Sequence, residues 1–308
     1  MKRILTIIML SGSMLALPGL ASAKVNVFAC EPEWGALAKA IGGDNVAVKA
    51  ATTAQQDPHH VRAKPSLLAA MRRADLVICS GAGLEIGWLP ILLEKAGNGN
   101  VQSGADGSLM AADFVHRLEV PAVVDRAQGD VHPQGNPHIQ TDPRNIAKIA
   151  PVLGVRLARI DPAHAAQYKA NTAAFMARWY AAIARWTAEG ASLKGIPLVS
   201  HHKAWAYLEN WLELKSVGTL EPKPGIPPTA SHLEELLGTV RAHPIKVIIR
   251  APYEPAEASQ WLSEKTGVPA AVLPFTVGGD AKSGDLFALF DRTISLLKEA
   301  ANHAPAQQ

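Results

Sequence analysis

One apolar stripe limits the architecture of this chain more than any other feature of its sequence. Between about Pro162 and Glu189, six side chains recur at intervals of three or four residues: Tyr168, Thr172, Phe175, Trp179, Ile183 and Trp186. This period places them on one face of a continuous α-helix. At 1.5 Å per residue the helix would extend roughly 40 Å, enough to run along two lobes. The sequence therefore predicts two lobes joined by one long rigid helix, with only a small closing motion between them.

Short apolar runs alternate with helical patterns on both sides of this segment. The expected strands are Val25–Cys30, Asn45–Ala50 and Leu76–Cys79 before it, and Ile196–Ser200, Leu214–Leu220, Lys246–Arg250 and Ala270–Phe275 after it. Strands that alternate with helices indicate a parallel sheet covered on both faces. We therefore expect an α/β fold of two lobes, each with a parallel-type sheet flanked by helices. The predicted bounds are 24–155 for the N-terminal lobe, 156–190 for the connecting helix and 191–308 for the C-terminal lobe.

The first 23 residues have the pattern of a secretory signal peptide. Lys2 and Arg3 give a positive start, an apolar run follows to about Leu20, and the small-x-small sequence ends at Ala23. The run is short for a membrane-spanning helix and contains a proline. We expect cleavage after Ala23 and release into the periplasm, with 1–23 as the signal peptide.

The net charge argues against one class of function, and the two cysteines raise a separate structural question. The formal net charge of the 308 residues is +3, and the predicted signal peptide carries two of the basic residues, so the mature chain is nearly neutral. Nucleic-acid binding, which needs a concentrated basic face, is not expected. Cys30 and Cys79 each lie near the end of an expected strand. In an oxidising compartment they could form a disulfide, or they could remain two buried thiols; spacing alone does not decide.

Three histidines stand in comparable places at or beyond expected strands. His59 follows Pro58, His138 follows Pro137, and His201 follows Ser200 at the end of a strand. In doubly wound sheets ligands gather at the carboxyl ends of strands, so these three imidazoles are expected to converge between the lobes. Neutral imidazole suits zinc, copper and nickel better than calcium or magnesium.

Other histidines lie beside the three candidate ligands or in a predicted loop. His60 and His202 directly follow His59 and His201. They are either neighbours only, or residues that hold the ligating side chains without binding the metal themselves. His132, in the loop from Val120 to Asn136, is either a solvated loop residue or an auxiliary outer zinc ligand beside Asp130.

The chain resembles the periplasmic metal-binding receptors of ABC importers for zinc and manganese, the zinc-uptake receptor type of cluster A-I. The resemblance rests on the order and spacing of several segments: Ile41-Gly42-Gly43, Asp57-Pro58-His59, Lys64-Pro65-Ser66, Ala74-Asp75-Leu76-Val77, Gly81-Ala82-Gly83-Leu84-Glu85, Asn136-Pro137-His138, Asp142-Pro143 and Ser200-His201-His202-Lys203-Ala204-Trp205-Ala206-Tyr207-Leu208. It implies that His59, His138 and His201 occupy the three imidazole positions of the family. It also implies zinc, because the manganese type places a carboxylate at the third position.

The fourth ligand position departs from the family pattern. Family members often carry an aspartate two residues beyond the aromatic of the last strand, where this chain has Val277. Asp280, on a glycine-rich turn, is the expected substitute. Asp285 is the alternative, although it also fits a helix cap, and a water molecule is a third option.

The resemblance implies binding rather than catalysis. The expected function is a monomeric periplasmic receptor that captures Zn²⁺ as transported ligand in the inter-lobe cleft. It would deliver the ion to the membrane permease and ATPase of an ABC importer, with a periplasmic metallochaperone as a further conceivable partner. The alternatives are a zinc-dependent hydrolase, a manganese-type receptor and a periplasmic metal buffer. No His-Glu-x-x-His motif supports the hydrolase.

Overall fold

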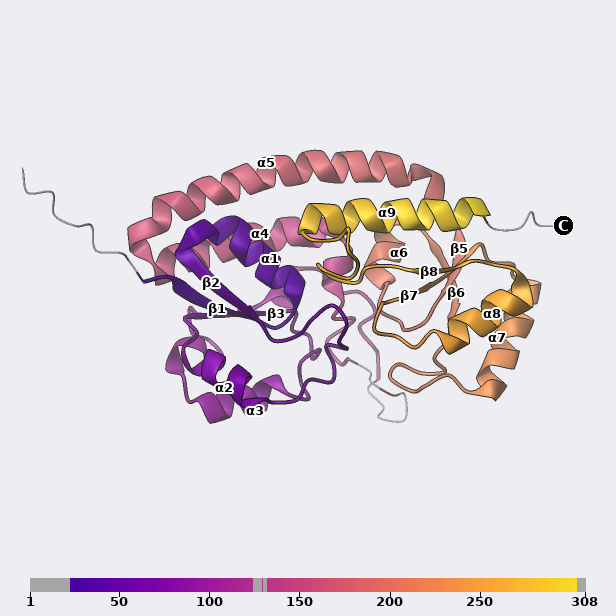
Figure 1. Cartoon of the computed structure of the whole chain (residues 1–308), viewed down its shortest axis with the longest axis horizontal. Helices are drawn as coiled ribbons and strands as arrows, with labels where there is room; N and C mark the ends of the chain where they lie inside the picture. The colour runs from indigo at the N-terminus through magenta and orange to yellow at the C-terminus, as the bar shows by residue number, and fades with distance from the viewer. Residues whose placement is uncertain (1–22, 124–128, 130–131, 304–308) are drawn as a thin grey trace, which may run out of the picture.

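The structure is a computed structural model that describes residues 23–123, 129 and 132–303 (Figure 1). Residues 1–22 of the predicted signal peptide lie outside the described residues, and so does Asp130, beside which His132 is the candidate auxiliary zinc ligand. In the part of the chain that is described, no helix is both long and apolar enough to cross a membrane.

The N-terminal lobe is built on a four-stranded, wholly parallel sheet. Its strands run in the order β2-β1-β3-β4, so the chain crosses to the other side of β1 after forming β2. The bounds are β1 (Val25–Ala29), β2 (Val46–Ala50), β3 (Leu76–Cys79) and β4 (Ser108–Met110), with helices α1 (Pro32–Gly42), α2 (Pro65–Arg72) and α3 (Leu89–Ala96).

The C-terminal lobe repeats this arrangement. Its sheet is also parallel and has the order β6-β5-β7-β8, so β5 takes the place that β1 has in the first lobe. The bounds are β5 (Pro197–Ser200), β6 (Lys215–Thr219), β7 (Val247–Arg250) and β8 (Ala270–Val272), with helices α6 (Ala206–Leu212), α7 (Ala230–Ala242), α8 (Glu257–Thr266) and α9 (Leu286–His303). In each lobe the change of direction beside the central strand creates the crevice where such folds bind ligands.

One long helix, α5 (Ala165–Glu189), connects the lobes, and α4 (Pro143–Ile160) precedes it in the chain. α4 ends where Asp161 and Pro162 interrupt the helix, and α5 begins after a short turn. The expected start of the connecting helix at residue 156 therefore falls inside α4. Figure 1 shows α5 running along both lobes, with α9 beneath it. Within the described residues, short 3-10 turns lie at Gly43–Asn45, Gly99–Val101, Ala111–Phe114, Ile139–Thr141, Pro162–His164 and Gly190–Leu193.

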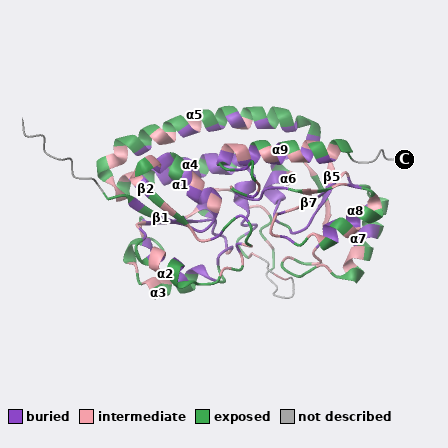
Figure 2. Cartoon of the chain, in the orientation of Figure 1, coloured by how far each residue is buried: buried purple, intermediate pink, exposed green. Residues whose placement is uncertain are grey.

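The predicted aromatic stripe is the inner face of α5. Tyr168, Phe175, Trp179 and Trp186 are buried, and Trp179 and Trp186 pack edge-on or tilted against Phe290 of α9. The hydrophobic core continues from the first sheet through α4, α5 and α9 to the second sheet. Figure 2 shows the buried inner side of α5 and its exposed outer side. The fold prediction of two parallel-sheet lobes joined by one long helix is confirmed.

The two cysteines are joined. β1 and β3 are hydrogen-bonded neighbours, with Ala29 beside Ile78, so the next residues, Cys30 and Cys79, meet and form a disulfide. Of the two options that the sequence left open, the structure therefore has the disulfide.

Candidate metal centre

Four imidazole rings lie together where the lobes meet. The ring centroid of His59 lies 5.3 Å from that of His132, 5.2 Å from that of His138 and 5.4 Å from that of His202. The centroids of His138 and His202 are 5.6 Å apart. His59, His132 and His138 each offer a ring nitrogen within 4.8 Å of the others, close enough to hold one metal ion.

His59 is fixed by the segment that follows β2. The Asp57 carboxylate accepts a hydrogen bond from the backbone N–H of His59 (2.9 Å) and pairs with its ring Nδ1 at 2.7 Å. The Trp88 indole N–H donates to the carbonyl oxygen of Pro58 at 2.9 Å. With Nδ1 engaged, Nε2 of His59 is left facing Nε2 of His132 at 3.3 Å. A carboxylate behind a ligating imidazole is the usual way in which a protein sets its tautomer and orientation.

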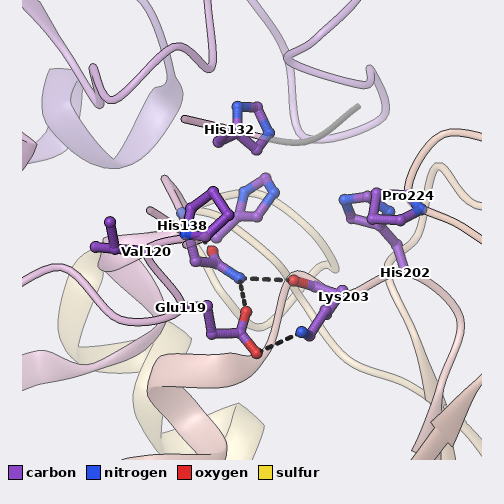
Figure 3. Close-up of a pocket in the computed structure, with 9 residues that line it drawn as sticks. Glu119, Val120, His132, His138, His202, Lys203 and Pro224 are labelled. Carbon is purple, nitrogen blue, oxygen red and sulfur yellow. Dashed lines mark hydrogen bonds and ion pairs between the residues drawn. The ribbon is translucent and has the colours of Figure 1, made fainter. Parts of the chain in front are cut away.

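His138 is positioned by Asn136, two residues before it. The Asn136 side-chain oxygen accepts the backbone N–H of His138 at 3.0 Å. Its amide group donates to Glu119 at 2.9 Å and to the carbonyl oxygen of Lys203 at 2.8 Å (Figure 3). Lys203 also pairs with Glu119 at 2.8 Å. Because Lys203 directly follows His202, this network links the segments that carry His138 and His202.

The buried ring nitrogens of His138 indicate that a ligand binds at this ring. His138 is 1% exposed, and neither of its ring nitrogens has a hydrogen-bond partner in the described structure. Leaving a buried polar atom unpaired costs about 1–3 kcal/mol. A metal ion would use one of these nitrogens, so the residues present fit a metal.

His202 follows β5 and resembles His59 in its surroundings. Its Nδ1 lies 2.6 Å from the Glu221 carboxylate, which also accepts the backbone N–H of Gly225. The two carboxylate–imidazole pairs, one from each lobe, therefore hold His59 and His202 in the same manner.

The electrostatics favour neutral imidazoles at the centre of the cluster. Burial, together with the charges of His59 and His202, lowers the pKa of His132 to about 4. Burial and the same neighbours lower the pKa of His138 well below its usual range. The pKa of His202 is raised overall: burial opposes protonation, but the hydrogen bond to Glu221 and the negative charges of Glu221, Glu254 and Asp57 together outweigh burial. Unprotonated ring nitrogens are the form that binds a metal.

The structure brings together some of the residues expected as ligands and separates others. His59 and His138 meet in the cluster, and His132, expected as an auxiliary ligand at most, lies inside it. The ring of His202 lies beside those of His59 and His138, although its nitrogens are outside the group of three histidines whose ligand atoms lie within 4.8 Å of one another. His201 lines a smaller cavity with Glu254.

Both expected carboxylate ligands have other partners. Asp280 forms an ion pair with Arg292 at 2.7 Å and accepts the backbone N–H of Lys282. Asp285 caps α9 by accepting the backbone N–H of Ala288 at 2.8 Å. Among the described residues, neither belongs to the group of converging ligand atoms.

The sequence pointed to His201, whereas the structure places the adjacent His202 beside the cluster. Beyond Ser200 the chain leaves the strand in a bend, so the two-residue alternation that assigns faces within a strand no longer applies. The spacing of the sequence could not choose between His201 and His202. For His132 the sequence offered only a histidine in an irregular loop, and no periodic pattern predicts where the side chains of such a loop lie.

The cluster borders a cavity of about 390 Å³ lined by His132, His138, His202, Asn136 and the Glu119–Lys203 pair (Figure 3). An ion in it would meet ring nitrogens from both lobes. Such an all-nitrogen set matches zinc and other late divalent metals, whereas manganese and magnesium prefer oxygen ligands.

Comparisons with known proteins agree with this geometry. The family model described as zinc-uptake complex component A periplasmic (ZnuA) matches residues 27–300. The high-affinity zinc uptake system protein ZnuA of Brucella abortus (strain 2308) is 25% identical over 159 residues, 51% of this chain and 47% of that protein, and its Brucella suis counterpart matches equally. The chain thus spans about half the length of the curated relatives it matches.

Solved structures have the same fold. A crystal structure of ZnuA superposes with a TM-score of 0.74 at 22% identity, covering 92% of this chain and 100% of the other. The Mn-bound periplasmic metal-binding protein from Candidatus Liberibacter asiaticus gives 0.73 at 19% identity, covering 90% and 99%. At these identities the likeness establishes the fold alone.

Proposed function

Since this chain belongs to the zinc-uptake complex component A periplasmic family, we propose that it is a periplasmic receptor that captures Zn²⁺ and delivers it to an ABC importer. The observation that carries the proposal is the meeting of four imidazoles from both lobes around the unpartnered ring of His138. The proposed partners are the importer's membrane permease and its ATPase. The protein acts by binding and release, without chemical conversion of the ion.

The proposed zinc ligands are His59, His132, His138 and His202. This set takes His202 in place of His201 and His132 in place of Asp280. Asp57 and Glu221 orient two of the rings and supply negative charge against the cation. Four ligands match the tetrahedral coordination that zinc prefers.

The donor atoms of the proposed ligands support zinc over manganese. Nitrogen ligands bind zinc more strongly than manganese by the general order of affinities. The solved relatives include a zinc-bound ZnuA deletion mutant as well as a Mn-bound protein, so the family fold accommodates both metals and the ligand set must make the choice.

The continuous core supports a receptor that changes shape little. α4, α5 and α9 join the two sheets through one hydrophobic cluster, and a hinge motion would have to disturb that packing. Capture would then depend on small movements of the loops that carry the histidines.

Calorimetric titration of metal-free, untagged protein with zinc and with manganese tests the proposal. We expect one tight zinc site, much weaker manganese binding, and a loss of zinc affinity of at least tenfold in each of His59→Ala, His138→Ala and His202→Ala. His201→Ala is the matched control, because it removes the adjacent imidazole and should leave the tight site intact. Equal zinc and manganese affinities, or a greater loss in His201→Ala than in His202→Ala, would contradict the assignment.

A further inference from the structure

A second, smaller cavity lies behind the imidazole cluster. It has a volume of about 130 Å³, and its walls include Asp57, His201, Glu221, Tyr253 and Glu254. His59 and His202 also line it, and His202 lines the larger cavity as well, so this ring lies between the two cavities. Several water molecules would fit in this volume.

Among the described residues that line this cavity, three buried atoms lack hydrogen-bond partners: Oε1 of Glu254, Nδ1 of His201 and the hydroxyl oxygen of Tyr253. Glu254 is 6% exposed and His201 is 2% exposed. One carboxylate oxygen of Glu254 accepts the backbone N–H of Ala251 at 2.5 Å, but Oε1 has no hydrogen bond, and neither has Nδ1 of His201. His201 directly follows β5, and Glu254 lies in the turn that follows β7. An oxygen and a nitrogen held without partners beside the same cavity indicate a ligand that accepts their lone pairs.

The charge of the cavity identifies the class of ligand. Three carboxylates line it, those of Asp57, Glu221 and Glu254, and its lining contains no lysine or arginine. Asp57 and Glu221 each use one oxygen for a ring Nδ1. The nearest guanidinium, that of Arg250, donates to the carbonyl oxygens of Ala251 and Glu254 rather than to a carboxylate. The cavity is therefore an acidic pocket without a cation of its own.

We propose that this pocket is a second divalent-cation site, with Oε1 of Glu254 and Nδ1 of His201 as its protein ligands. Water molecules and the carboxylates of Asp57 and Glu221 complete its surroundings. A mixed carboxylate, imidazole and water set accepts Mn²⁺ or a second Zn²⁺. The proposal rests on the proposed function, because the two sites share the carboxylates that support the imidazoles. For the same reason the second ion binds more weakly than the first.

Manganese provides a selective probe of the second site. Protein loaded with one equivalent of Zn²⁺ is titrated with Mn²⁺, and free Mn²⁺ is followed by electron paramagnetic resonance. A zinc indicator in parallel measures whether zinc is released; the nitrogen ligands should keep it, because they favour zinc over manganese. We expect one Mn²⁺ bound per zinc-loaded chain.

Glu254→Gln is the decisive variant. Glutamine keeps the shape of the side chain and an oxygen to accept the Ala251 N–H, but it removes the negative charge. We expect at least a tenfold loss of Mn²⁺ affinity with the first zinc equivalent unaffected. Glu264→Gln, the same charge change on an exposed side chain of α8, should match wild type. No Mn²⁺ binding to zinc-loaded wild type, or equal binding in Glu254→Gln, would overturn the proposal.

A further titration distinguishes failure of the second site from failure of the proposed zinc site. The same Mn²⁺ titration on zinc-free His138→Ala protein examines the acidic pocket with the imidazole site disabled. Binding there that disappears on adding Glu254→Gln supports the second site, whatever metal the imidazole cluster takes. Binding that persists in the double variant contradicts it.

Discussion

At the residue scale, the candidate metal centre depends on what stands behind each imidazole. His59 presents Nε2 to the cluster because the Asp57 carboxylate engages its Nδ1, and the Glu221 carboxylate engages Nδ1 of His202 in the same way. His138 instead depends on Asn136, which fixes its backbone while bonding to Glu119 and Lys203. Glu119 adopts a left-handed backbone conformation, with φ of 55°. Such conformations persist in non-glycine residues where surrounding interactions hold them, and they often mark functional sites.

Loss of the Glu221 carboxylate should weaken zinc binding through His202. We expect Glu221→Ala to lower zinc affinity about 10- to 100-fold, the usual range for a group that orients a ligand. Combined with His202→Ala, its effect should be much less than additive, because both changes remove the same ligand. Competition titrations against a zinc chelator would measure the four affinities. Glu264→Ala, at an exposed position on α8, is the control; an additive double variant would contradict the orienting role.

Loss of Asn136 should affect the same site from the other lobe. Asn136→Ala removes the acceptor of the His138 backbone N–H and both bonds towards Glu119 and Lys203. We expect faster zinc dissociation, by about tenfold, measured by stopped-flow transfer to a chelator. An unchanged dissociation rate in a folded variant would show that His138 is held by other means.

At the element scale, the strands and helices were largely predictable. The stripe of Tyr168 to Trp186 predicted α5 because a buried helix face repeats with the helical period. The strand expected to end at Phe275 instead ends at Val272, because β8 is paired with β7 only as far as Arg250 opposite Val272. Loop geometry was less predictable: which of two adjacent histidines faces inward, and whether His132 reaches the cluster, depend on bends that carry no period.

The disulfide between β1 and β3 should stabilise the N-terminal lobe. It closes a loop with a sequence separation of 49 residues. Removing a disulfide of this kind typically costs 2–5 kcal/mol, so we expect Cys30→Ser/Cys79→Ser to lower the free energy of unfolding by about that amount. Urea unfolding of the metal-free protein would measure it. A change below about 1 kcal/mol would mean that the unfolded chain gains little freedom.

At the scale of the whole molecule, one buried contact joins the lobes beside the site. Glu33 of α1 is 1% exposed. Its backbone N–H donates a hydrogen bond to the Thr276 hydroxyl at 3.1 Å, and its carboxylate accepts a hydrogen bond from the same hydroxyl. Burial raises the pKa of Glu33 from 4.5 to about 7, although the bond from Thr276 opposes the shift.

The raised pKa of Glu33 makes the stability of the fold dependent on pH. Between about pH 4.5 and 7 the folded state keeps a proton that the unfolded state has lost, so this group's contribution to stability falls as pH rises. The shift corresponds to at most about 3 kcal/mol. We expect Glu33→Gln to gain stability relative to wild type as the pH is raised from 5 to 8, measured by urea unfolding. A constant difference across that range would contradict the shift.

The central claim is that four imidazoles share one zinc ion. Two of them lie on the segment before α4, one lies on the segment between β2 and α2, and one lies just after β5. X-ray absorption at the zinc edge, on protein loaded with one equivalent of zinc, tests it most directly. We predict a shell of four nitrogen ligands at about 2.0 Å, with outer-shell scattering from four imidazoles that falls to three in His132→Ala and in His202→Ala. The imidazole count should stay at four in His201→Ala and in Asp280→Ala. A wild-type shell that loses an imidazole in His201→Ala, or a ligand in Asp280→Ala, would contradict the account.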